Sequence, residues 1–305
     1  MKQATLLYLA VVAGFGTLLL FGSAGSLAPA PAAGEGDSVK LATPQRVRPP
    51  RMKASYDFAG EQVPVDDYDV AERLDRELLT NTFSHSSTQH ILKHRHRYFE
   101  VIEPILREEG VPEDLKYVAI AESGLRDFRS PAGAAGVWHF MKGTAREYGL
   151  EVNDEVDERY HLEKATRAAA RLFKDLRASL GSWTLAAAAY NRGAAGIRRD
   201  KAEQGGETYY DLNLNAETGR YVFRIVALKD ILDDPTYYGF YLQDEDRYPS
   251  FPDYSVVRVT ESVPSWADFA QEHGISYRKL KYFNPWLRDS KLTVKTKEYE
   301  IRLPR

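Results

Sequence analysis

Residues 118–124 read Val-Ala-Ile-Ala-Glu-Ser-Gly, which places one carboxylate in an otherwise apolar segment. Residues 112–114, Pro-Glu-Asp, form a typical helix start, because proline fits the first turn and acidic side chains favour the positive end of the helix dipole. Leu115, Val118 and Glu122 then share one face of the predicted helix. Gly124 is expected to end it.

The position of Glu122 suits it to proton transfer. An apolar face normally turns toward a core, and a desolvated carboxylate holds its proton more tightly than a free one. The negative end of the helix dipole also disfavours the charged form. Both effects favour a protonated side chain that can act as a general acid. The alternative is a glutamate that reaches outward into solvent.

Further helices are predicted on both sides of this segment. Apolar residues recur at three- and four-residue steps from Leu162 to Leu176, which indicates an amphipathic helix. Residues 183–190 are nearly all apolar and predict a buried central helix that delivers Tyr190 and Asn191 to its end. Residues 88–109 also have helical spacing, which Pro104 is expected to kink or interrupt. The core is therefore predicted to be helical.

The segment Gly133 to Phe140 is a glycine-containing loop. Gly133 and Gly136 permit a backbone that approaches a bound ligand closely. Trp138 either fills the core, which is the favoured interpretation because large aromatic side chains mostly contribute buried area, or stacks on a bound ring.

Taken together, these segments resemble the lytic transglycosylases that share a goose-type-lysozyme-like core, the SLT superfamily. The resemblance covers roughly residues 87–230. Four blocks carry it in the family's order: residues 121–123, residues 133–140, residues 189–193, and Glu217-Thr218 with Tyr221-Val222. Each block is weak alone, but the four are specific jointly.

The resemblance implies roles for individual side chains. Glu122 corresponds to the family's sole catalytic acid/base. Ser123 corresponds to a serine that helps orient the glycan, and Tyr190 and Asn191 to side chains that contact the substrate near the scissile bond. Glu217 and Tyr221 correspond to residues of a later helix that closes the groove.

His139 departs from the family, which usually has glutamine at this position. A neutral imidazole offers one donor and one acceptor, as an amide does, so a substrate contact can survive the replacement. The contact would also become pH-dependent. His139 is therefore either a tolerated substitution at the rim of the groove or a lesion that removes glycan affinity or activity.

The resemblance also explains how one carboxylate can suffice. Common glycosidases need two carboxyl groups, and no spacing in the sequence sets a second one opposite Glu122. The nearby acids, Asp127, Glu147, Glu151, Asp154, Asp157 and Glu158, are expected to be mostly solvated surface charge. In the family, the single acid protonates the oxygen between N-acetylmuramic acid and N-acetylglucosamine and then deprotonates the muramic acid C6 hydroxyl. The product is a 1,6-anhydro end, and no water is consumed.

Composition limits the classes of protein and of site that the chain can contain. The chain has 305 residues, 43% hydrophobic and 28% charged, which is ordinary for a soluble globular protein. The net charge of −3 does not favour binding to nucleic acid. The absence of cysteine excludes disulfides, thiolate sites and an N-terminal lipidated cysteine. His90 and His94 lie one turn apart, but the zinc-protease glutamate is missing, so no metal site is predicted. No cofactor is implied.

The N-terminus predicts export. Residues 1–33 contain an apolar run from Ala4 to Phe21 after Lys2, which indicates a secretory signal peptide or a membrane anchor of borderline length. Residues 34–66 are expected to be a disordered, proline-rich linker. The predicted location is the periplasm or cell envelope, with an anchor in the inner membrane if the segment is not cleaved.

Three further segments complete the predicted organisation. Residues 67–233 form the lysozyme-like catalytic domain, and residues 234–253 an aromatic and proline-rich connector that packs on it. Residues 254–305 resemble a LysM domain in the order β, α, α, β, with Ser265 and Ser276 as helix caps. Residues 255–305 carry ten Lys and Arg against six Asp and Glu, or +4, which suits an anionic wall polymer. The module either binds glycan or is a degenerate remnant kept for packing.

The fold class expected is thus mainly α, with a lysozyme-like helical domain and a small LysM-like module. Three functions are consistent with it. The first is an exported lytic transglycosylase acting on peptidoglycan strands, and the second is a water-using muramidase on the same fold. The third is a wall-binding protein whose groove has decayed at His139.

Overall fold

The computed structural model describes residues 48–305. The predicted signal or anchor at residues 1–33, and the predicted linker before residue 48, lie outside these residues. Within the described residues, no helix is both long enough and apolar enough to cross a bilayer.

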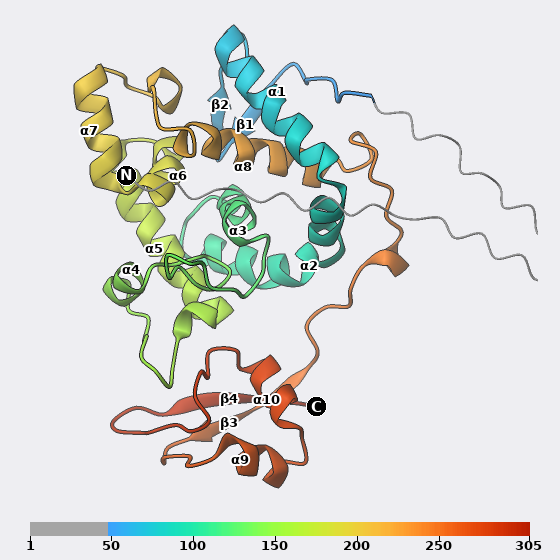
Figure 1. The fold of residues 1–305 in the computed structure, drawn as a ribbon, viewed down its shortest axis with the longest axis vertical. Coiled ribbons are helices and arrows are strands. Elements are labelled where there is room, and N and C mark those ends of the chain that lie inside the picture. Colours follow the sequence, from blue (N-terminus) through green and yellow to red (C-terminus); the bar gives the residue numbers. More distant parts are fainter. Residues whose placement is uncertain (1–47) are drawn as a thin grey trace, which may run out of the picture. The chain divides into compact units, whose positions relative to one another are not determined.

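The larger part of the described chain is helical, as the sequence predicts (Figure 1). Helix α1 packs against α8, α5 packs against α2 and α6, and α3 packs against α8. The α-helices of this region are α1 (Tyr68–Phe83), α2 (His85–Glu108), α3 (Lys116–Ser123), α4 (Lys142–Glu147), α5 (Leu162–Leu180), α6 (Trp183–Arg192), α7 (Ala194–Gln204) and α8 (Thr218–Asp233). Short 3₁₀ helices cover Glu113–Leu115, Glu158–Tyr160, Tyr209–Asp211 and Asp244–Asp246.

Small side chains let the central helices approach closely. Residues 186–189 of α6 are four alanines, all fully or almost fully buried, and α5 adds Ala165, Ala168 and Ala169 at 0% exposure. Phe173 of α5 lies within the same core. Because alanine has little bulk, these helix backbones can lie close together around larger neighbours. The packing places the end of α6 beside the segment that contains Trp138.

Pro104 lies inside α2, which continues through it from His85 to Glu108. Pro104 therefore does not interrupt this helix, and a kink at Pro104 stays a prediction. Proline removes one backbone donor, but the apolar face of α2 is buried along its whole length, including Ile91, Ile102 and Leu106. Tertiary packing outweighs the local penalty.

The prediction of a disordered linker at residues 34–66 is also partly wrong, because residues 56–63 form a structured hairpin. Strands β1 (Tyr56–Phe58) and β2 (Glu61–Val63) pair antiparallel through a turn at Ala59-Gly60, where both residues have positive φ. Phe58 is fully buried in the main core. The Glu61 carboxylate accepts hydrogen bonds from the backbone N–H groups of Trp183 and Thr184 (2.6 and 2.8 Å), so it caps the start of α6.

The C-terminal residues have the predicted β, α, α, β order. Strand β3 (Tyr254–Val259) pairs antiparallel with β4 (Tyr299–Pro304), and helices α9 (Trp266–Glu272) and α10 (Tyr277–Phe283) lie between them in sequence. Ser265 and Ser276 cap these helices through their hydroxyl groups, as predicted.

This module shares its core with a segment of the helical region. Ala135, Val156 and Tyr160 are buried together with Trp266 and Trp286 of the module. The backbone also pairs across this contact, because Asp157 N–H donates to the Trp286 carbonyl (2.9 Å) and Arg288 N–H to the Glu155 carbonyl (2.8 Å). The connector at residues 234–253 packs on α2, with Tyr238 and Phe240 buried.

Candidate active site

Glu122 lies in the last turn of α3, and its side chain is only 15% exposed. The helix ends at Gly124, which adopts the left-handed conformation with φ 61°, as predicted. The Oε1 atom of Glu122 accepts a hydrogen bond of 2.5 Å from the Tyr221 hydroxyl of α8. Glu122 therefore points into a partly desolvated site rather than into open solvent.

Tyr221 is a fully buried donor to this carboxylate. Burial, followed by the negative charge of Glu122, holds the pKa of Tyr221 well above its ordinary value. The phenol therefore keeps its proton across the working pH range. It fixes one oxygen of Glu122, which leaves Oε2 as the atom that can exchange a proton with a bound substrate.

His139 directly faces the free oxygen, with Nδ1 3.4 Å from Glu122 Oε2. Its backbone is in the left-handed region at φ 54°, which is uncommon for a residue other than glycine. The imidazole centroid lies 4.9 Å from that of Phe128, and Nε2 is buried with no hydrogen-bond partner among the described residues. His139 is thus adjacent to the carboxylate, which does not agree with a position at the rim of the groove.

Tyr190 and Asn191 lie at the end of α6. The Tyr190 hydroxyl donates to the Trp138 carbonyl (2.7 Å), and burial, followed by the charge of Glu122, raises its pKa well above the ordinary value. Asn191 Oδ1 accepts from the Thr218 hydroxyl (2.8 Å) and so ties α6 to α8. Trp138 itself is fully buried and donates to Thr166 (2.9 Å), which agrees with the core interpretation.

Ser123 is 3% exposed and faces the protein interior. Its hydroxyl lies 2.7 Å from the Val137 carbonyl and 3.1 Å from the Ala119 carbonyl. These contacts tie the loop that carries His139 to α3, the helix that carries Glu122. A direct contact of Ser123 with substrate stays a prediction.

Glu217 is exposed at the start of α8 and is not joined to the Glu122 cluster. It lines a separate cavity of about 760 Å³ together with Arg73 and Arg220. Its predicted role in closing the groove therefore has no support from a contact within the described residues.

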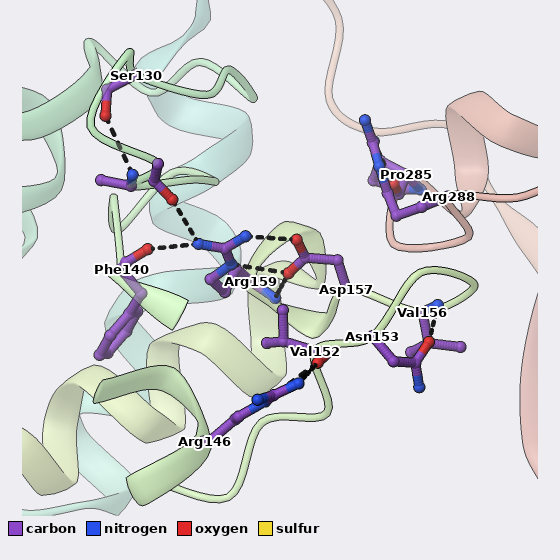
Figure 2. A network of polar contacts seen from close by, with 12 residues as sticks. Ser130, Phe140, Arg146, Val152, Asn153, Val156, Asp157, Arg159, Pro285 and Arg288 are labelled. Carbon is purple, nitrogen blue, oxygen red and sulfur yellow. Dashed lines mark hydrogen bonds and ion pairs between the residues drawn. The ribbon is translucent and has the colours of Figure 1, made fainter. Parts of the chain in front are cut away.

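Arg159 braces the loop that carries His139, a role that no local sequence pattern indicates. Its guanidinium makes two hydrogen bonds with Asp157 (2.9 and 2.7 Å) and donates to the carbonyls of Gly133 (2.8 Å) and Phe140 (3.0 Å) (Figure 2). Both charged side chains are buried. The nearby acids are expected to be mostly solvated surface charge, and Asp157 and Glu158 are exceptions because both are buried. The Asp157 carboxylate pairs with Arg159, and its backbone N–H donates to Trp286 of the C-terminal module. The Glu158 carboxylate pairs with Lys164 and with Lys297 of the module.

Gly136 packs directly against Arg159. Its φ is 76°, and a Cβ atom placed there would lie 1.9 Å from the Arg159 carbonyl oxygen. Only glycine fits, so the loop can approach the backbone of residues 159–160 closely. The module, Asp157, Arg159 and the loop thus form one continuous set of contacts that leads to His139.

The contacts of Glu122 indicate single-carboxylate chemistry. Among the described residues, its side chain contacts one phenol and one imidazole, and no second carboxylate. The arrangement can hold one proton near Oε2 and return it after a bond has broken.

The family comparisons match this site. Residues 100–213 match the transglycosylase SLT domain, and residues 255–305 match the soluble lytic transglycosylase C-terminal LysM-like domain. The chain contains an SLT transglycosylase domain. The first match includes Glu122, His139 and the Tyr190-Asn191 pair, and the second covers nearly all of the β, α, α, β module.

Two relatives extend the similarity over most of the chain. Both are named membrane-bound lytic murein transglycosylase D, from Escherichia coli strain K12 and from strain O6:H1 CFT073. Each is 29% identical over 286 residues, which covers 88% of this chain and 61% of the relative. This chain therefore spans about three fifths of their length.

Among solved structures, an inactive mutant of lytic transglycosylase Slt from Pseudomonas aeruginosa is similar at a TM-score of 0.38 and 19% identity. The match covers 50% of this chain and 26% of that one.

Proposed function

We propose that this protein is a peptidoglycan lytic transglycosylase that cleaves the β-1,4 bond between N-acetylmuramic acid and N-acetylglucosamine without water. The observation that carries the proposal is the half-buried Glu122 of an SLT domain, held by Tyr221 and lacking a partner carboxylate among the described residues. Peptidoglycan is the substrate that the relatives' name, murein transglycosylase, suggests.

In the first step, protonated Glu122 gives its proton to the bridging glycosidic oxygen. The bond from this oxygen to C1 of N-acetylmuramic acid then breaks, and positive charge develops at C1. The leaving sugar keeps the proton as a new hydroxyl group. Glu122 becomes a carboxylate whose charge stabilises the developing cation.

In the second step, the C6 hydroxyl of the same muramic acid attacks C1. Its proton passes to the Glu122 carboxylate, which restores the acid, and the new C6–O–C1 bridge is the 1,6-anhydro ring. The nucleophile is tethered to the electrophile, so the step avoids the entropic cost of bringing in a water molecule. One group with a fixed oxygen can therefore perform both proton transfers.

Hydrolysis is the second candidate, and the His139–Glu122 contact is the observation that favours it. An imidazole 3.4 Å from the catalytic oxygen can accept a proton from a water molecule. Such a water would attack C1 in place of the C6 hydroxyl and leave a reducing end.

The proposed location is the cell envelope. Export is supported by the apolar N-terminal residues, and the relatives are named as membrane-bound. Anchoring through an uncleaved N-terminal segment would tether the catalytic domain near the membrane. We further propose that the LysM-like module helps to hold the glycan.

Digestion of purified peptidoglycan followed by mass spectrometry tests the reaction. The proposal expects fragments with anhydro ends from the full chain and none from a Glu122→Gln variant. Glu147→Gln, which changes an exposed carboxylate in the same domain, is the matched control and should digest as the unmodified protein does. Fragments with reducing ends would support the muramidase, and equal digestion by Glu122→Gln would exclude the mechanism.

A further inference from the structure

A second cavity, which we name the seam pocket, lies where α2 and the connector meet the LysM-like module. Its volume is about 330 Å³. It does not include Glu122, Tyr190 or Tyr221, so it is separate from the catalytic cluster. Its aromatic wall consists of Tyr98, Phe251, Tyr254, Tyr282, Phe283 and Trp286.

Several of these rings are exposed rather than packed in a core. Tyr282 is 56% exposed, and Phe251 and Tyr254 are each 37% exposed. Aromatic surface left in water costs free energy unless a partner covers it, and exposed apolar patches often mark binding sites. The seam pocket therefore offers flat, unfilled aromatic faces.

Polar groups converge on the same pocket. The guanidinium of Arg97 lies 5.4 Å from the centroid of the Phe251 ring, and its Nε atom is buried with no hydrogen-bond partner among the described residues. The exposed Asp127 carboxyl also lines the pocket. Arg302 is paired with Glu163 at 2.7 Å. Such a pocket, mostly apolar with a few placed polar groups, is typical of small-ligand sites.

The chemistry of the wall selects the class of ligand. A purely apolar molecule would leave Arg97 Nε without a partner, which is costly for a buried donor. A simple anion would face Asp127 and Glu163. A pyranose ring has an apolar C–H face that fits an aromatic ring and a rim of hydroxyl groups that can pair with Arg97 and Asp127.

We infer that the seam pocket binds a single sugar unit of the glycan strand outside the catalytic groove. The identity of the ligand rests on the proposed function, because a glycan is the substrate of that reaction. The pocket holds a distant part of the strand against the module and the helical region together. Binding there would raise affinity for long strands without touching the reacting bond.

Calorimetric titration of the full chain with a tetramer of N-acetylglucosamine tests this inference. All proteins carry Glu122→Gln, so that no cleavage occurs. Tyr282→Ala and the double variant Tyr254→Ala/Tyr282→Ala should bind at least fivefold more weakly than the parent. Tyr277→Ala is the matched control, because Tyr277 is also an exposed tyrosine of α10 (41%) but does not line the pocket.

The readout separates this inference from the proposed function. Unchanged affinity of both Tyr282→Ala and the double variant would overturn the proposal that the seam pocket binds a sugar. An equal loss of affinity in Tyr277→Ala would do the same, whatever products the enzyme forms. Hydrogen exchange provides a local check, since the tetramer should protect residues 277–286 in the parent and not in Tyr282→Ala. Absence of anhydro products from the active chain would contradict the proposed reaction but leave this binding result intact.

Discussion

His139 Nδ1 lies 3.4 Å from Glu122 Oε2, and Tyr221 holds the opposite oxygen of the same carboxylate. The residue that departs from the resembled family's pattern thus lies next to the carboxylate proposed to act as the acid. At this distance an imidazole ring can exchange a proton with that carboxylate, which a glutamine amide cannot do. The departure therefore changes the chemistry available beside Glu122.

His139→Gln restores the residue that the resembled family usually has at this position. An imidazole ring 3.4 Å from Glu122 Oε2 can take the proton that the glycosidic oxygen needs, whereas a glutamine amide cannot. The variant should therefore release anhydro fragments faster than the unmodified protein, both measured in the same buffer. Equal rates would show that the ring does not influence Glu122.

Tyr221→Phe should lower kcat with little change in folding. The variant removes one hydrogen bond to a charged group, worth about 1.5–3 kcal/mol, and therefore about 10- to 100-fold in rate. Tyr117→Phe is the control, because Tyr117 is also a buried tyrosine that donates to a carboxylate, that of Asp233, outside the site. If the two variants lose activity equally, the effect of Tyr221 is not specific to the site.

Arg159→Ala should destabilise the fold by about 3–5 kcal/mol, because it leaves Asp157 buried and unpaired. Denaturant unfolding measures the change. Arg146→Ala, which removes a contact with the Val152 carbonyl at an exposed side chain, should cost much less. The double variant Asp157→Ala/Arg159→Ala should recover part of the loss, and a failure to do so would argue against the buried pair as its cause.

Gly136→Ala and Gly133→Ala form a matched pair. Both positions have positive φ, which costs about 1 kcal/mol for alanine. A Cβ atom added at Gly136 would lie 1.9 Å from the backbone oxygen of Arg159. A Cβ atom added at Gly133 would have its nearest neighbour 3.8 Å away, at the end of the flexible Arg129 side chain. Gly136→Ala should therefore lower the melting temperature far more, and similar melting temperatures would contradict the close approach.

Much of the helical core follows from sequence alone. The end of α3 at Gly124, the apolar run of α6 and the β, α, α, β order of the module are local patterns, since periodicity and capping act over a few residues. A local pattern of this kind, together with a family resemblance, also indicates Glu122. These features were predictable because neighbouring residues determine them.

Tertiary structure decided the rest. The burial of residues 56–63, the continuation of α2 through Pro104, and the Arg159 brace all depend on partners far away in the chain. His139 approaches Glu122 because the loop at residues 133–140 folds against α3. Glu217, just before α8, lines a cavity, whereas Tyr221 of the same helix contacts Glu122. Long-range packing determines which side chains meet, and a local pattern carries no record of it.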